Sequence, residues 1–66
     1  MKMTIEFNMD NQAFVDDLSI ETMRVLQQVA NKVYNLYPVD FDNLINRDSL
    51  LRDTNGNIVG TWKISK

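Results

Sequence analysis

The sequence contains no cysteine and no histidine, and it has only two glycines. The lack of cysteine excludes disulfide bonds, thiolate metal ligands and a cysteine nucleophile, and the lack of histidine removes the commonest general base. Two glycines are too few for a glycine-rich phosphate-binding loop. The carboxylates of Asp16, Asp17, Asp40 and Asp42 are best explained as helix caps and solvated loop acids. We therefore expect no enzymatic activity, no metal site and no cofactor.

The chain has 66 residues, a net charge of −2 and no long apolar run. A single domain of this size, residues 1–66, buries only about 60% of the surface of its unfolded chain, so a partner subunit is the simplest further source of stability. The mildly acidic balance makes nucleic acid an unlikely partner, because phosphate contacts need a basic surface. No segment approaches the roughly 18 apolar residues of a membrane span, and the first residues lack the apolar part of a signal peptide. We expect a cytoplasmic homodimer that does not contact a membrane.

Two segments at the start of the chain carry apolar side chains. Residues 2–9 alternate strictly between apolar and polar, which predicts a half-buried strand with one apolar face, formed by Met3, Ile5, Phe7 and Met9. The turn-forming residues 10–12 end this strand. The short apolar patch 13–15 is interpreted as a loop that tucks Phe14 beneath the following helix.

The middle of the chain has the periodicity of an amphipathic helix. Asp16, Asp17 and Ser19 offer oxygens for its N-cap, Glu21 adds favourable negative charge to the first turn, and Pro38 ends it. The predicted buried face is an apolar stripe of Met23, Leu26, Ala30, Val33 and Tyr37, widened by Ile20, Val29 and Leu36 and bordered by Val25 and Tyr34.

The last part of the chain predicts a β-hairpin. The pair Asn55-Gly56 stands between two apolar runs and favours a tight turn, because both residues tolerate positive φ. Gly60 within the outgoing strand indicates a bulge or the close approach of another group. Alternation in that strand predicts one face of Ile58, Gly60, Trp62 and Ile64 and an opposite face of Val59, Thr61 and Lys63.

Residues 38–49 allow two interpretations. Asp40 could cap a short helical turn at 40–46 that carries Phe41, Leu44 and Ile45, or these three side chains could be tucked inward from a plain loop.

Together these elements predict an α+β fold of order β-α-β-β, in which one amphipathic helix packs on a three-stranded sheet. The other face of the sheet is expected to be open, or to be a dimer surface if apolar residues such as Val59 or Leu50 lie on it.

Two stretches resemble a group of small phage and prophage proteins. Residues 5–14, Ile-Glu-Phe-Asn-Met-Asp-Asn-Gln-Ala-Phe, are similar to their strand and Asp-Asn-x-Ala-Phe motif. Residues 51–60, Leu-Arg-Asp-Thr-Asn-Gly-Asn-Ile-Val-Gly, are similar to their hairpin motif Leu-Arg-Asp-x-Asn-Gly-Asn-x-Val-Gly. With the intervening helix, the likeness covers about two thirds of the chain and leaves 37–49 unmatched. It implies a small phage accessory protein, of a kind that often binds a host component, including as an inhibitor of bacterial defence.

Two functional hypotheses follow. The first is a phage-encoded accessory protein that binds a host protein and inhibits a host enzyme or an anti-phage defence system. Aromatic and arginine side chains dominate such interfaces, and the candidates are Tyr34, Tyr37, Phe41, Arg47, Arg52 and Trp62. The alternative is a homodimeric sponge for a signalling nucleotide or other small ligand, with an aromatic ring stacked on the base and an arginine at the phosphate. For Trp62, packing in the core or at a dimer contact beside Ile64 competes with both roles.

Overall fold

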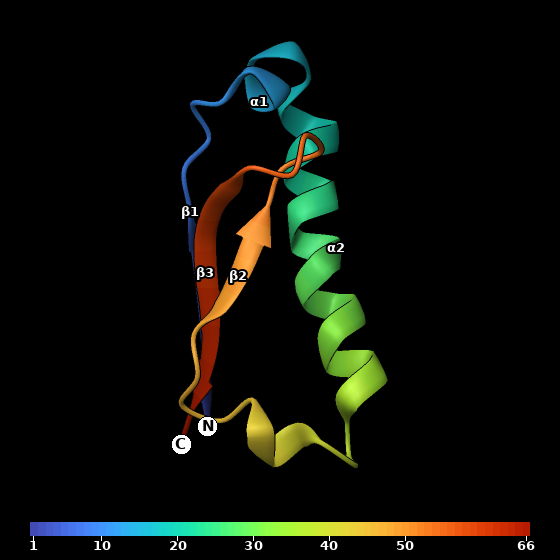
Figure 1. Cartoon of the computed structure of the whole chain (residues 1–66), viewed down its shortest axis with the longest axis vertical. Helices are drawn as coiled ribbons and strands as arrows, with labels where there is room; N and C mark the ends of the chain where they lie inside the picture. Colours follow the sequence, from blue (N-terminus) through green and yellow to red (C-terminus); the bar gives the residue numbers. More distant parts are fainter.

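The computed structural model describes residues 1–66 and confirms the α+β fold of order β-α-β-β (Figure 1). Its elements are β1 (Lys2–Phe7), α1 (Gln12–Asp16), α2 (Leu18–Leu36), the 3₁₀ helix η1 (Phe41–Asn43), β2 (Ser49–Arg52) and β3 (Ile58–Ser65). The strands form one antiparallel sheet in the order β1-β3-β2, so β3 is central. The molecule measures 36 × 17 × 17 Å, with α2 and the sheet along its length.

The two ends of the long molecule are formed by different segments of the chain. The hairpin loop lies near α1 and the first turns of α2 (Figure 1). The segment that joins α2 to β2 crosses the opposite end, where both termini of the chain also lie. None of the helices combines the length and the apolar character needed to cross a membrane.

One apolar core lies between the helices and the sheet. Its buried members come from α1, α2, β2, β3 and the residue that follows η1, and they are Phe14, Val25, Val29, Leu44, Leu51, Val59, Trp62 and Ile64. From β1, Ile5 and Phe7 pack against this core while half-buried. Figure 1 shows α2 running alongside β2.

Residues 13–15 are helical, so their interpretation as a loop is wrong, but the predicted burial of Phe14 is confirmed. The carbonyl of Asn11 accepts the N–H groups of Phe14 and Val15 at 3.0 and 3.1 Å. This turn satisfies the segment's own peptide groups while Phe14 enters the core, where its ring stacks on Phe7 at 5.9 Å between centroids.

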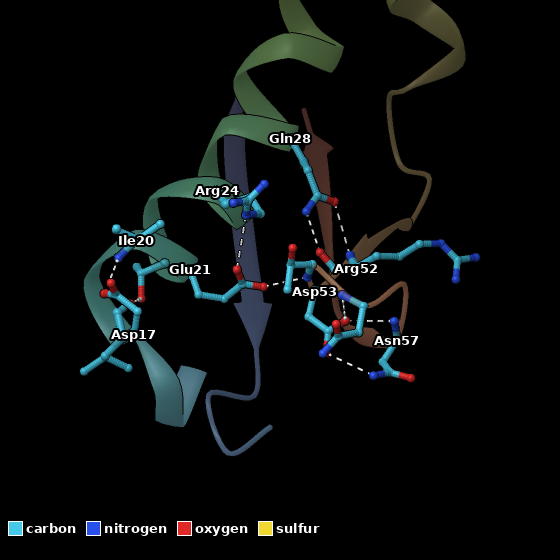
Figure 2. A network of polar contacts seen from close by, with 12 residues as sticks. Asp17, Ile20, Glu21, Arg24, Gln28, Arg52, Asp53 and Asn57 are labelled. Carbon is cyan, nitrogen blue, oxygen red and sulfur yellow. Dashed lines mark hydrogen bonds and ion pairs between the residues drawn. The ribbon is translucent and has the colours of Figure 1, made fainter. Parts of the chain in front are cut away.

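Helix α2 is preceded by its N-cap Asp17, whose carboxylate accepts the N–H of Ile20 at 3.1 Å (Figure 2). Of the three predicted N-cap residues, Asp17 is therefore the one that caps. The hydroxyl of Ser19 instead donates to Asp17 at 3.2 Å. At the other end, the chain leaves the helix at Tyr37, directly before Pro38, as predicted.

The buried face of α2 differs from the predicted stripe. Val25, placed at the edge of that stripe, is 0% exposed, whereas Met23, placed within it, is 62% exposed. The residues at the centre of the buried face are Glu21, Val25 and Val29. Glu21 and, from the same side of the helix, Gln28 make hydrogen bonds to the hairpin, and these bonds fix the rotation of α2. The surplus of the wide apolar stripe is left on the surface.

The predicted hairpin is confirmed, but its turn is not centred on Asn55-Gly56. The N–H of Gly56 donates to the carbonyl of Asp53 at 3.0 Å, which makes Thr54 and Asn55 the central residues. Within the hairpin loop only Gly56 has positive φ, +85°, and the N–H of Asp53 donates to the carbonyl of Asn57 at 2.9 Å. The chain therefore forms a type I turn followed by one left-handed residue.

Both features considered for Gly60, a bulge and the close approach of another group, are present. The register shifts beside it, from Leu51↔Gly60 to Arg52↔Ile58, so Val59 is an extra residue in β3. A Cβ on Gly60 would lie 2.5 Å from the Cα of Phe7 and would also strike the carbonyl of Glu6. The bulge reverses the predicted faces at this end of β3, because Val59 enters the core and Ile58 is exposed.

The segment before β2 contains a short helical turn, as one of the two interpretations predicted. The 3₁₀ helix η1 lies within 40–46, and the side chain of Asp40 makes no capping bond, so its predicted role is wrong. Leu44 is buried, and Phe41 and Ile45 pack against the core while half-buried.

The outer face of the sheet is mostly polar. Thr4, Glu6, Thr61 and Lys63 are exposed on it, and the apolar Leu50 is exposed opposite Thr61. Of the two apolar residues considered for a dimer surface on this face, Val59 lies in the core and Leu50 is exposed.

Candidate functional site

A network of hydrogen bonds ties the hairpin loop to the rest of the chain (Figure 2). We call it the loop clasp, and its members are Asn11, Glu21, Gln28 and Asp53. The carboxylate of Asp53 is buried, and its Oδ1 accepts the N–H groups of Asn55 and Asn57, both at 2.9 Å. Its Oδ2 accepts the side-chain amides of Asn11 at 2.8 Å and of Asn57 at 3.2 Å.

Helix α2 supplies the other half of the loop clasp. The buried carboxylate of Glu21 accepts the N–H of Thr54 at 2.7 Å and pairs with Arg24 at 3.2 Å, the only ion pair in the chain. The side-chain amide of Gln28 accepts the N–H of Arg52 at 3.1 Å and donates to the carbonyl of the same residue. Gln28 thus contacts β2 as a neighbouring strand would.

The electrostatics of the loop clasp favour the ionised form of Asp53. The hydrogen bond from Asn11 is the main cause that lowers the pKa of this carboxyl below its ordinary value of 3.8. Desolvation acts in the opposite direction, and the bonds from Asn57 and Asn55 lower the pKa further. No buried side-chain nitrogen or oxygen in the chain lacks a hydrogen-bond partner. The buried polar groups of the loop clasp therefore all have partners within the chain, and these bonds hold the hairpin loop in place as a structural joint.

The two sequence motifs meet in this joint. Asn11 belongs to the Asp-Asn-x-Ala-Phe stretch and Asp53 to the Leu-Arg-Asp stretch, and the two residues bond to each other. Sequence reasoning did not connect them, although their presence in two separate motifs was a usable signal. For Gln28, a polar residue on a helix, the sequence carried no such signal.

Two of the predicted partner-binding residues form an aromatic cluster at the end of α2. The rings of Tyr37 and Phe41 meet edge to face, with centroids 5.3 Å apart. Tyr37 is exposed and Val39, between them in sequence, is 87% exposed. We call this surface the aromatic end, formed by Tyr37, Val39 and Phe41.

Arg47 lies at the same end of the molecule, in the wall of a polar hollow. The hollow has a volume of about 350 Å³ and is lined by Lys32, Leu36, Asp40, Asn43, Leu44, Arg47, Asp48 and Ser49. Two cations and two carboxylates therefore share its wall, which has no net charge.

The other three residues predicted to bind a partner are not part of the aromatic end. Trp62 is 3% exposed and belongs to the core, so its indole offers no surface to a partner. Arg52 lies beside the hairpin loop, where its guanidinium donates to the carbonyl of Gly56 at 3.0 Å. Tyr34, 84% exposed, lines a different surface between α2 and β1.

That surface is a groove of about 530 Å³, which we call the β1–α2 groove. Every residue that lines it is apolar or aromatic: Met3, Ile5, Leu26, Val29, Ala30, Val33 and Tyr34. The helix contributes five of these residues, of which Leu26, Ala30 and Tyr34 are exposed, and β1 contributes Met3 and Ile5 from its inward face. Sequence reasoning placed most of these residues in the core.

No group of three or more acidic side chains is arranged to hold a metal ion. Comparison of the chain with protein-family models, with curated proteins and with solved structures gives no significant match.

Proposed function

We propose that this chain is a phage-encoded accessory protein that acts in the host cytoplasm by binding a host protein, and that it inhibits a host enzyme or an anti-phage defence system without catalysis. The observation that carries the proposal is the aromatic end. Its exposed Tyr37 is an aromatic side chain of the kind that anchors interfaces, and the contact with Phe41 holds the tyrosine ring in place. The exposed Val39 adds apolar surface two positions along the chain.

The charge around the aromatic end determines which kind of partner surface is complementary to it. Residues 37–49 carry three carboxylates, Asp40, Asp42 and Asp48, and one guanidinium, Arg47, for a net charge of −2. Asp40 and Asp42 are exposed on either side of Phe41. The partner surface that fits is an apolar hollow with a basic rim, because opposite charges at the rim steer the encounter and fix its orientation.

Co-purification from host lysate, followed by titration calorimetry with the purified partner, tests this proposal. We expect Tyr37→Ala to weaken binding about 30-fold, the effect of removing an interface anchor. Met23→Ala, an exposed apolar residue elsewhere on α2, is the matched control and should bind as the parent chain does. Partners that bind the Tyr37→Ala and parent chains equally would contradict the proposal, as would the recovery of no host protein.

The second candidate function is the binding of a signalling nucleotide, and one observation favours it. Lys32 and Arg47 line the same hollow, where their charges could meet a phosphate. Asp40 and Asp48 line it as well, and their charge opposes an anion. A rise in melting temperature with a cyclic dinucleotide, abolished by Arg47→Ala, would support this function, and a flat response across nucleotides would remove it.

A further inference from the structure

Strand β1 has a free edge. It pairs with β3 on one side, and the sheet order β1-β3-β2 leaves nothing on the other. The N–H of Asn8 donates toward β3, to the carbonyl of Val59 at 2.9 Å. Because peptide groups alternate between the two sides of a strand, those of Met3 and Ile5 point to the free edge. These groups are available to another strand.

An apolar surface adjoins this edge on the inner side of the sheet. The hydrogen bonds of Gln28 hold α2 over β2, so the helix leaves the inner face of β1 partly uncovered. The β1–α2 groove is the result, and Met3, Leu26, Ala30 and Tyr34 are exposed along it. A strand added to β1 would fill this groove if it carried apolar side chains at alternate positions.

The sequence of β1 itself has apolar side chains at alternate positions, which is the pattern that a strand paired with this edge requires. We propose that the free edge of β1 binds β1 of a second copy, antiparallel and about a two-fold axis, with Thr4 opposite its own symmetry mate. In that register Met3 lies opposite Ile5 of the second copy on the inner face. Lys2 lies opposite Glu6 of the second copy on the outer face, and symmetry creates each of these contacts twice.

Two observations favour a second copy over an unrelated strand. The first is charge complementarity, because the register that centres on Thr4 brings opposite charges together at both ends. Lys2 and Glu6 make no ion pair within the chain, where Arg24–Glu21 is the only one. The second is that the Thr4 register uses the peptide groups of Met3 and Ile5, the ones that face the free edge. The two grooves then face each other across a continuous six-stranded sheet.

The interface is separate from the aromatic end, so this inference does not rest on the proposed function. Sedimentation equilibrium from micromolar to millimolar concentration tests it. The mass expected for the dimer is 15.4 kDa, twice the 7.7 kDa of the chain. A chain that stays monomeric over the whole range would overturn the inference.

Charge reversal tests the register. Lys2→Glu and Glu6→Lys each place like charges opposite each other twice, and each should weaken the dimer about tenfold. The double variant restores both pairs and should restore the affinity. Lys32→Glu, on the exposed side of α2 and outside the groove, is the control and should leave the dimer unchanged.

The groove is tested by Ala30→Glu, which places a carboxylate among apolar side chains at an exposed helix position that tolerates glutamate. We expect the loss of the dimer, with the helical circular dichroism of the monomer retained. A dimer that persists in Ala30→Glu would overturn this interface. A double charge-reversal variant that remains as weak as the single variants would overturn the register.

Discussion

The side-chain amide of Asn11 donates to Oδ2 of Asp53 at 2.8 Å, across 42 positions of the sequence. Asn11 precedes the helix that buries Phe14, and Asp53 organises the hairpin loop. This one bond therefore couples the start of the chain to its closing hairpin. The stretches 5–14 and 51–60, which contain these two residues, therefore meet in one structural joint.

Removal of this amide should destabilise the chain. We expect Asn11→Ala to lower the free energy of unfolding by about 1–2 kcal/mol, because a bond to a charged, buried acceptor is lost. Urea unfolding monitored by the fluorescence of Trp62 measures the change. Asp10→Ala, at an exposed neighbouring position, is the control. In a double-mutant cycle with Asp53→Ala, strictly additive losses would show that the two residues do not interact.

The stability of the chain should fall in acid, in part through Asp53. The pKa of Asp53 lies below 3.8 in the folded chain and near 3.8 when unfolded, so its contribution is fully present above that value. The contribution is lost as pH falls through the lowered folded pKa, because the unfolded chain takes up the proton more readily. Urea unfolding between neutral pH and pH 2.5 should show a weaker pH dependence for Asp53→Asn. The Asp10→Asn control should follow the parent chain, and a parallel curve for Asp53→Asn would refute this assignment.

The two glycines should tolerate alanine differently. Gly60→Ala forces a methyl group against the backbone of β1, and we expect a loss of about 3 kcal/mol or more. Gly56→Ala meets no neighbouring atom, but φ of +85° strains an L-residue, at a cost of about 1–2 kcal/mol. Thermal unfolding of the two variants gives the ranking. The reverse ranking would mean that β1 and β3 do not approach as closely as described.

The rotation of α2 is tested by two apolar truncations. Val25→Ala removes buried methyl groups from the core and should cost about 2–3 kcal/mol. Met23→Ala, at an exposed position, should change the free energy of unfolding by less than about 0.5 kcal/mol. Chemical denaturation at a single low protein concentration measures both. A larger cost at Met23 than at Val25 would indicate that α2 buries the face predicted from the sequence.

Local signals predicted most of the fold. The period-two alternation of β1, the apolar periodicity of α2 and the Asn-Gly signal of the hairpin each lie within one element, so the sequence specifies them directly. The rotation of α2 was not predictable in this way. It depends on Glu21 and Gln28, whose partners lie 33 and 24 positions away. The turn geometry likewise depends on the carboxylate of Asp53, which accepts two loop N–H groups.

The candidate surfaces were predicted less well than the fold. The choice of exposed aromatic residues identified Tyr37 and Phe41, but their contact depends on the path of the chain after Pro38. The same reasoning included Trp62, because residue type alone does not distinguish an interface anchor from a core residue. The β1–α2 groove was not predicted because the whole of the wide apolar stripe on the helix was assigned to the buried face. How much of such a stripe stays exposed depends on the width of the sheet it covers.

The bonds of Gln28 to Arg52 have a consequence for the size of any assembly. They occupy hydrogen-bonding groups on the outer edge of β2, a strand of only four residues, so this edge is poorly suited to template another chain. A sheet with one receptive edge can join one other sheet and then has nothing left to extend. Pairing through β1 would therefore end in a closed particle of two copies, and Gln28 would protect the protein against growth into fibres.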